Sequence, residues 1–227
     1  MTRYAGLDGI RGAWVLVWIE GRKRGFERLD DIAHLFDRPV ARAAIDIPIG
    51  IPDSGDRGCD MAAKQMLGKN HNRVFTGVLR WMLDMPMLKR EHYFAINRAA
   101  QAKGEKRISL QMFGILPKIR DVDRAMTPAR RTQLIECHPE LVFQRLNGGR
   151  AVPGKKTAQG HALRRELLKA DGFDALDDWL GARRGTGIKP DDLLDACACA
   201  IAARDTIARL PEAPRSDPRG LRMEINY

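Results

Sequence analysis

The chain has 227 residues, which is enough for one large domain or two small ones. Hydrophobic residues make up 44% of it and charged residues 30%, the balance of a globular protein. No apolar run reaches the ~18–20 residues that cross a bilayer, and Met1–Tyr4 leads straight into a strand pattern without a signal-peptide layout. These features argue against a membrane protein and indicate a soluble cytoplasmic one.

The net charge is +10 at pH 7. An excess of Lys and Arg attracts phosphate backbones and anionic membranes alike, and nucleic acid, either DNA or RNA, is the partner that we expect. The four cysteines contain no CxxC pair, which argues against a zinc ribbon and predicts buried, reduced thiols.

Four apolar runs near the N-terminus predict strands, and a short segment between the third and the fourth predicts a helix. The strands are expected at Tyr4–Asp8, Ala13–Glu20, Phe26–Leu29 and Val40–Ile47, and the helix at Ile32–Phe36. In this β-β-β-α-β order, a meander and a helical crossover bring the fourth strand parallel to the first. Asp8 and Asp46 then lie at the same carboxyl edge of the sheet, where open α/β sheets place their sites.

The rest of the chain predicts a single α/β domain over residues 1–227, with a helical insertion at about 52–131. After the insertion, an apolar run at Gln133–Cys137 predicts a further strand. Pro and Asp at Lys189–Asp192 start a long Ala-rich helix over Leu193–Ala208. No internal repeat or low-complexity linker interrupts this pattern.

Three of the apolar strands end with an acid, at Asp8, Asp46 and Glu136. An ionised carboxylate at the edge of an apolar core is unfavourable unless something pairs with it. A shared Mg²⁺ or Mn²⁺ would pair all three, because these ions prefer carboxylate oxygens and water. The alternative is that each acid is an ordinary turn or capping residue.

The late helix adds two more acids. Asp192 and Asp195 are three residues apart and therefore share one face of the helix. The residues after Asp195 are small and apolar, which allows the helix to pack very close to the sheet. Its first turn can then lean over the strand ends and present both carboxylates to the same metal.

Several segments resemble known families. GLDG (Gly6–Gly9) resembles the first hairpin of ribonuclease-H-like nucleases, and DLLDA (Asp192–Ala196) is similar to the closing helix of RuvC-type Holliday-junction resolvases. Nearly the whole chain resembles the bacterial domain-of-unknown-function family number 429, described as predicted ribonuclease-H-like nucleases. The segments that carry this resemblance, in the family's order, are GLDG, AIDIPIG (Ala44–Gly50), Cys59-Asp60, PKIRDVD (Pro117–Asp123), ECHPE (Glu136–Glu140), KKTAQG (Lys155–Gly160) and DDLLDACACAIAA (Asp191–Ala203).

The resemblance implies a ribonuclease-H-like mixed sheet flanked by helices, and a metal-dependent nuclease that hydrolyses phosphodiesters. One or two Mg²⁺ or Mn²⁺ ions would be held by Asp8, Asp46 and Asp195, with Asp192 and Glu136 assisting. Two other functions stay open. The chain could be a non-catalytic nucleic-acid or nucleotide-binding module with the same acidic cleft, or a phosphatase of a small phosphorylated metabolite.

Further candidate residues lie beside the family-like segments. His138 follows Glu136 closely and is a candidate general acid or base, although a His that ends a strand also serves as a structural hydrogen-bonding group. Four basic residues are candidate phosphate contacts, with the alternative that each is a solvated surface charge. They are Lys155, Lys156, Arg57 and Lys118, of which the adjacent Lys155-Lys156 pair is preferred.

Overall fold

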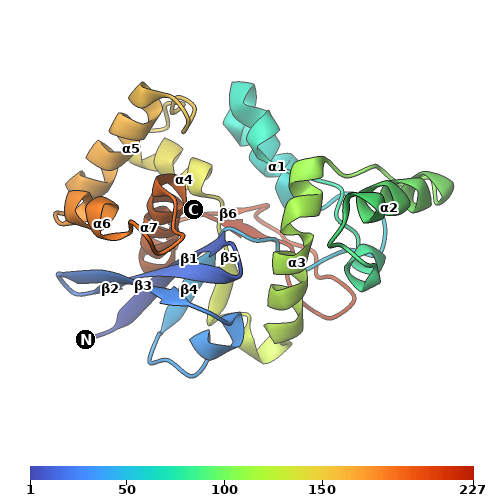
Figure 1. The fold of residues 1–227 in the computed structure, drawn as a ribbon, viewed down its shortest axis with the longest axis horizontal. Coiled ribbons are helices and arrows are strands. Elements are labelled where there is room, and N and C mark those ends of the chain that lie inside the picture. Colours follow the sequence, from blue (N-terminus) through green and yellow to red (C-terminus); the bar gives the residue numbers. More distant parts are fainter. The chain divides into compact units, whose positions relative to one another are not determined.

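A computed structural model describes all residues of the chain, 1–227 (Figure 1). The chain divides into two compact units. The first unit contains Met1–Ile47, Thr132–Arg209 and Asn226–Tyr227, and the second contains Pro48–Arg131 and Leu210–Ile225. None of the helices combines the length and the apolar character that a membrane span requires. This division into two units does not test the prediction of one domain with a helical insertion, which stays a prediction.

The first unit is built on a mixed five-stranded sheet with the strand order β3-β2-β1-β4-β5. Strands β1, β2 and β3 are antiparallel neighbours, while β4 runs parallel to β1 and β5 runs parallel to β4. The strands are β1 (Arg3–Ile10), β2 (Ala13–Glu20), β3 (Lys23–Leu29), β4 (Arg42–Ile45) and β5 (Leu134–Glu136). The predicted α/β class, the meander and the parallel return are therefore confirmed.

The crossover between β3 and β4 is tighter than the predicted helix. It contains only a 3-10 helix, Ile32–Leu35, whose first turn is capped by the side chain of Asp31. Strand β4 is shorter than predicted and ends at Ile45, so that Asp46 is the first residue beyond it. The backbone N–H of Asp46 still donates to the carbonyl of Leu7 at 3.3 Å, which keeps Asp46 in line with β1.

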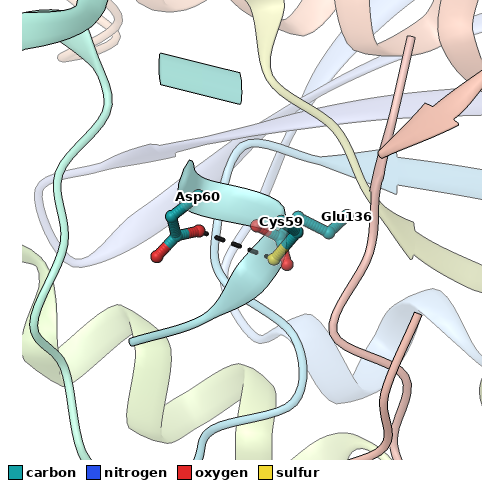
Figure 2. A group of neighbouring side chains, drawn as sticks. All are labelled: Cys59, Asp60 and Glu136. Carbon is teal, nitrogen blue, oxygen red and sulfur yellow. Dashed lines mark hydrogen bonds between the residues drawn. The ribbon is translucent and has the colours of Figure 1, made fainter. Parts of the chain in front are cut away.

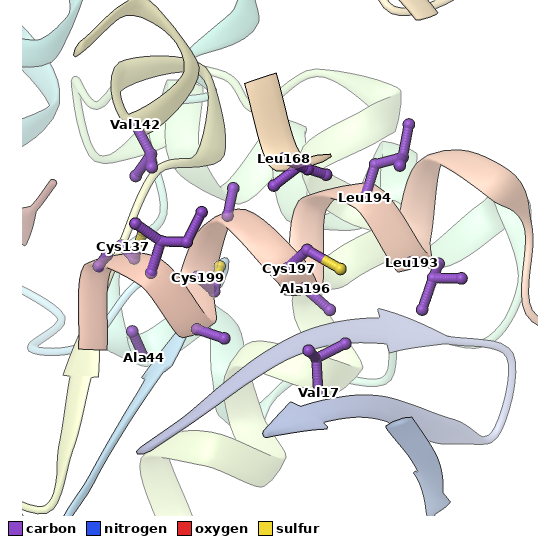
Figure 3. Packing of buried hydrophobic residues seen from close by; sticks show 14 of the residues in the cluster. Val17, Ala44, Cys137, Val142, Leu168, Leu193, Leu194, Ala196, Cys197 and Cys199 are labelled. Atoms are coloured by element: carbon purple, nitrogen blue, oxygen red, sulfur yellow. The ribbon is translucent and has the colours of Figure 1, made fainter. Parts of the chain in front are cut away.

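Helix α7 (Pro190–Asp205) packs directly on one face of the sheet (Figure 1). Figure 3 shows Leu193 and Ala196 on its sheet side, near Val17, while Leu194 lies on the side of Leu168. The approach is so close that a Cβ on Gly6 would lie 2.1 Å from the carbonyl oxygen of Ala196. The small residues of α7 thus have the packing role that the sequence predicted.

Three further helices of the first unit pack beyond or beside α7. They are α4 (Pro139–Leu146), α5 (Ala158–Ala170) and α6 (Leu176–Ala182). Trp179 of α6 packs against Phe26 of β3 in a tilted arrangement, with 5.4 Å between the ring centroids, and this contact covers the antiparallel end of the sheet. The cysteines of α7 lie in this core, and no cysteine of the chain forms a disulfide.

The second unit is mainly helical. Its helices are α1 (Gly58–Leu67), α2 (Arg90–Ala102) and α3 (Leu110–Ala125), with 3-10 helices at Gly68–Arg73, Arg80–Asp84 and Pro128–Arg130. Charged residues hold it together: Arg80 pairs with both Asp123 and Asp217, and Asp217 also accepts a hydrogen bond from the Ile51 N–H at 3.0 Å. The short strands β6 (Arg209–Leu210) and β7 (Ile225–Asn226) form a separate two-stranded sheet, and each of them has one residue in each unit.

Candidate metal centre

Two of the predicted acids meet on the sheet face that α7 covers. Side chains alternate between the two faces of a strand, so Asp8 points to the same face as Gly6, which touches α7. Leu7 is aligned with Ile45 in the parallel β1–β4 pair, which places Asp8 and Asp46 at the same level. Asp8 and Asp46 therefore stand side by side at the carboxyl edge of the sheet.

Helix α7 presents a third carboxylate to this pair. Asp195 lies in the second turn of the helix and is only 2% exposed. Asp192, one turn earlier, is half-buried, and its Oδ2 accepts a hydrogen bond from the Lys189 N–H at 3.0 Å. Asp192 thus caps the helix as well as standing near the other acids. We call Asp8, Asp46 and Asp195 the acidic triad.

The charges of the triad act strongly on one another. Burial raises the pKa of Asp8 well above its ordinary value, and the charges of Asp195, Asp46 and Asp192 raise it further. Burial is also the main reason why the pKa of Asp46 and the pKa of Asp195 rise to about 6. Without a cation the triad is consequently an unfavourable arrangement, as like charges held close in a buried site always are.

One ammonium group already opposes this charge. Lys155 Nζ lies 2.6 Å from Oδ2 of Asp195, and the Lys155 side chain is 42% exposed. Burial disfavours the charged ammonium, but Asp195, Asp46 and Asp8 outweigh it and raise the pKa of Lys155 above its ordinary value. Lys155 therefore pairs with an acid of the site, and its predicted phosphate contact stays a prediction.

The donor set of the triad suits a hard divalent cation. Oδ1 of Asp195 is buried and has no hydrogen-bond partner, an arrangement that costs free energy unless something binds there. Apart from the Lys155 ammonium, the charged groups of this site are carboxylates, whose oxygens Mg²⁺ and Mn²⁺ prefer as ligands. The chemistry of these donors, with one buried oxygen left unpartnered, therefore suits the predicted metal.

The loop that carries Lys155 is held tightly against α5. The Thr157 hydroxyl caps the helix by accepting from the Gly160 N–H at 3.0 Å, and it donates to the Gly154 carbonyl at 2.8 Å. A Cβ on Gly160 would lie 2.2 Å from that same carbonyl oxygen, so only glycine fits there. This geometry explains the family-like segment KKTAQG as a support that aims Lys155 at the triad.

A buried ion pair between Arg164 and Glu140 also fixes the loop that carries Lys155. Arg164 of α5 is 1% exposed and donates to both carboxylate oxygens of Glu140 in α4, at 2.7 and 2.9 Å. Its other terminal nitrogen donates to the carbonyl of Pro153 at 2.8 Å. The negative charge of Glu140 also contributes to the raised pKa values of Asp46 and Asp195. Glu140 and Arg164 thus position the site without belonging to the triad.

The structure does not bring Glu136 to the triad. Glu136 is aligned with Ile45 in the β4–β5 pair, whereas Ile135 and Cys137 belong to the core under α7. Because strand side chains alternate, Glu136 points to the opposite face of the sheet from Asp8 and Asp46. His138 is the N-cap of α4, and its Nδ1 accepts from the Glu140 N–H at 3.3 Å, the structural role that was the alternative for it.

Two of the predicted phosphate contacts belong to the second unit. Arg57 is buried there, pairs with Asp60 at 2.7 Å and donates to the carbonyls of Gly50 and Ile49. Figure 2 shows the adjacent Cys59, whose thiol is hydrogen-bonded to Asp60 with 3.6 Å between sulfur and oxygen. Lys118 lies half-buried in α3. The Arg57–Asp60 ion pair therefore holds the start of α1 in place.

Lys156 is exposed beside Lys155 in the first unit, where two other exposed basic residues lie close in sequence to the acids. Arg11 is at the β1–β2 turn, three residues after Asp8, and Lys189 immediately precedes α7. Sequence reasoning missed Arg11 and Lys189, and it missed Arg164 and Gly160 as supports. Its only available signal for the last two was their place within or just after KKTAQG.

Comparison with protein families gives one match. The model of a family described as "Protein of unknown function (DUF429)" matches residues 6–215. The matched range includes the acidic triad, Lys155 and the residues that support it. Comparisons with curated proteins and with solved structures give no match.

Proposed function

Because the chain belongs to the DUF429 family, a family without an assigned activity, its function has to be argued from the site, and we propose that it is a divalent-metal-dependent nuclease of ribonuclease-H-like type. The observation that carries the proposal is the acidic triad, in which Oδ1 of Asp195 is buried and has no hydrogen-bond partner. A structural cluster of this kind would have its oxygens satisfied by protein donors.

The sheet supports the ribonuclease-H-like part of the proposal. An antiparallel β1-β2-β3 meander followed by parallel β4 and β5 is compatible with that fold. Asp8 on the central strand, Asp46 after its parallel neighbour and Asp195 on the covering helix occupy three separate elements. Elements this far apart in the sequence carry acids whose charges act on one another, which favours a site over three unrelated turn residues.

The residues of the chain have distinct roles in this proposal. Asp8, Asp46 and Asp195 hold the metal, and Asp192 orients the first turn of α7 through its capping hydrogen bond. A bound Mg²⁺ or Mn²⁺ supplies Lewis acidity toward the phosphoryl oxygen and lowers the pKa of water. The exposed Arg11, Lys156 and Lys189 contact phosphates on either side of the scissile one.

The overall charge supports an anionic polymer as substrate. The chain has a net charge of +10, although its candidate centre is acidic. Basic residues around the centre attract the phosphate backbone, and the triad makes hydrolysis depend on a divalent cation. Nucleic acid, DNA or RNA, is therefore the proposed partner.

The test uses purified protein and labelled single-stranded DNA, double-stranded DNA, RNA and a DNA–RNA hybrid, with Mg²⁺ or Mn²⁺. We expect at least one substrate to be cut, and we expect Asp8→Asn and Asp46→Asn to abolish cutting. Asp177→Asn is the matched control, because Asp177 is an aspartate of the same unit that pairs with Lys169 at the surface. It should cut like the wild type.

Other outcomes would replace the proposal. Salt-dependent binding without any cleavage, unchanged by Asp8→Asn, would identify a binding module instead. Release of phosphate from small phosphomonoesters, with no cut in any polymer, would identify a phosphatase.

A further inference from the structure

The Lys155 ammonium sits among the very carboxylates that would hold the metal. Its Nζ lies 2.6 Å from Asp195 Oδ2, and its charge also lowers the pKa values of Asp46 and Asp8. We propose that the centre binds a single divalent cation and that Lys155 supplies the second positive charge. This inference rests on the metal centre of the proposed function and assigns its stoichiometry.

The two carboxylate oxygens of Asp195 have different surroundings. Oδ2 is occupied by Lys155, and Oδ1 is buried and unpartnered. Asp195 therefore offers one oxygen to a metal while the ion pair with Lys155 persists. A second divalent ion that shared Asp195 in a bridging manner would need Oδ2 as well, and would have to displace the ammonium.

The charges lead to the same stoichiometry. The three ionised carboxylates of the triad and one ammonium carry a net charge of −2, which one divalent cation neutralises. Asp192 is left out of this count because the charge of Lys189 opposes its own. A second divalent ion would leave the buried centre with a charge of +2, which is unfavourable where water screens poorly. Removing the ammonium changes the count to −3, which strengthens attraction for the first ion and allows a second.

The loop around Lys155 holds the residue in position, while its side chain remains accessible to a substrate. Thr157 and Gly160 hold its loop against α5, so the ammonium does not depend on a mobile segment for its position. An ammonium has three N–H donors, and the side chain is 42% exposed. While one donor pairs with Asp195, another can reach a phosphate oxygen at the mouth of the centre.

The test is a Mn²⁺ titration of the full chain, with bound and free ion distinguished by electron paramagnetic resonance and affinity measured by calorimetry. We expect one bound Mn²⁺ in the wild type. Lys155→Met, which keeps the length of the side chain and removes its charge, should bind the first ion roughly tenfold more tightly and take up a second. Lys155→Arg should retain one ion.

Lys156→Met is the matched control, because it removes the adjacent exposed charge and should leave number and affinity unchanged. Two ions in the wild type would overturn the inference, as would a Lys155→Met variant with unchanged Mn²⁺ number and affinity. These readouts need no substrate. A centre that binds one ion, responds to Lys155→Met and cuts nothing would therefore uphold this inference while rejecting the nuclease.

Discussion

Gly6 of β1 lies directly beneath Ala196 of α7, so close that a Cβ on Gly6 would be 2.1 Å from the Ala196 carbonyl oxygen and 2.1 Å from the Ala200 nitrogen. Both of these atoms belong to the helix backbone, which cannot turn aside as a flexible side chain can. The contact sets the distance between the helix that carries Asp195 and the strand that carries Asp8. The position of Asp195 relative to Asp8 thus depends on the absence of a Cβ at Gly6.

Gly6→Ala should consequently weaken both the fold and the centre. We expect a loss of at least about 3 kcal/mol in the free energy of unfolding, at or beyond the upper end of ordinary overpacking, because backbone must move. Urea denaturation measures it, and Mn²⁺ affinity should fall as Asp195 moves away from Asp8. Gly181→Ala in α6 is the control: a Cβ there meets no atom within 4 Å, so stability should rise by about 0.5–1 kcal/mol. Equal stability of Gly6→Ala and wild type would contradict the close packing.

Arg164→Met tests the support beneath the Lys155 loop. Removing the guanidinium leaves the buried Glu140 carboxylate without its bidentate partner, and we expect a loss of about 3–5 kcal/mol in stability. Pairing the change with Glu140→Gln should recover part of the loss. The neighbouring Arg165→Met removes a surface pair with Asp177 and should cost less than about 1 kcal/mol. Similar losses for the two arginines, measured by urea denaturation, would show that the buried pair has no special role.

The triad also predicts how stability depends on pH in the absence of metal. Asp46 and Asp195 titrate at a pKa of about 6 in the folded protein, against ~3.9 in an unfolded chain. Between these values the folded protein binds more protons than the unfolded chain. These two groups therefore make the free energy of unfolding decrease as pH rises from ~4 to about 6, with no further change above that range.

Urea midpoints across a pH series in chelator, compared between wild type and Asp46→Asn, measure this contribution. The wild type should lose stability relative to the variant through the window, and added Mn²⁺ should cancel the difference by favouring the ionised carboxylates. Asp177→Asn should show the opposite sign, because hydrogen bonds from Lys169 and Arg165 hold the pKa of Asp177 below its ordinary value. A wild type and an Asp46→Asn variant with parallel pH profiles would refute the prediction.

The sequence by itself determined that Asp8 and Asp46 share a sheet edge and that a close-packed helix carries Asp195 to the same face. It could do so because these conclusions follow from local patterns: apolar runs of strand length, a short crossover, and small residues at helical spacing. Family membership followed in the same way, from short segments in a constant order, and the family match over residues 6–215 confirms it.

Only the tertiary structure decided which of the other charged residues join that edge. Glu136 ends its strand as Asp46 nearly does, but pairing with Ile45 turns it to the opposite face, and a register shift of one residue reverses every side chain. Lys155 meets Asp195 across 40 residues of chain, and Arg164 meets Glu140 between two helices. Such pairings depend on how separate elements are placed in space, and no local pattern in the sequence records that placement.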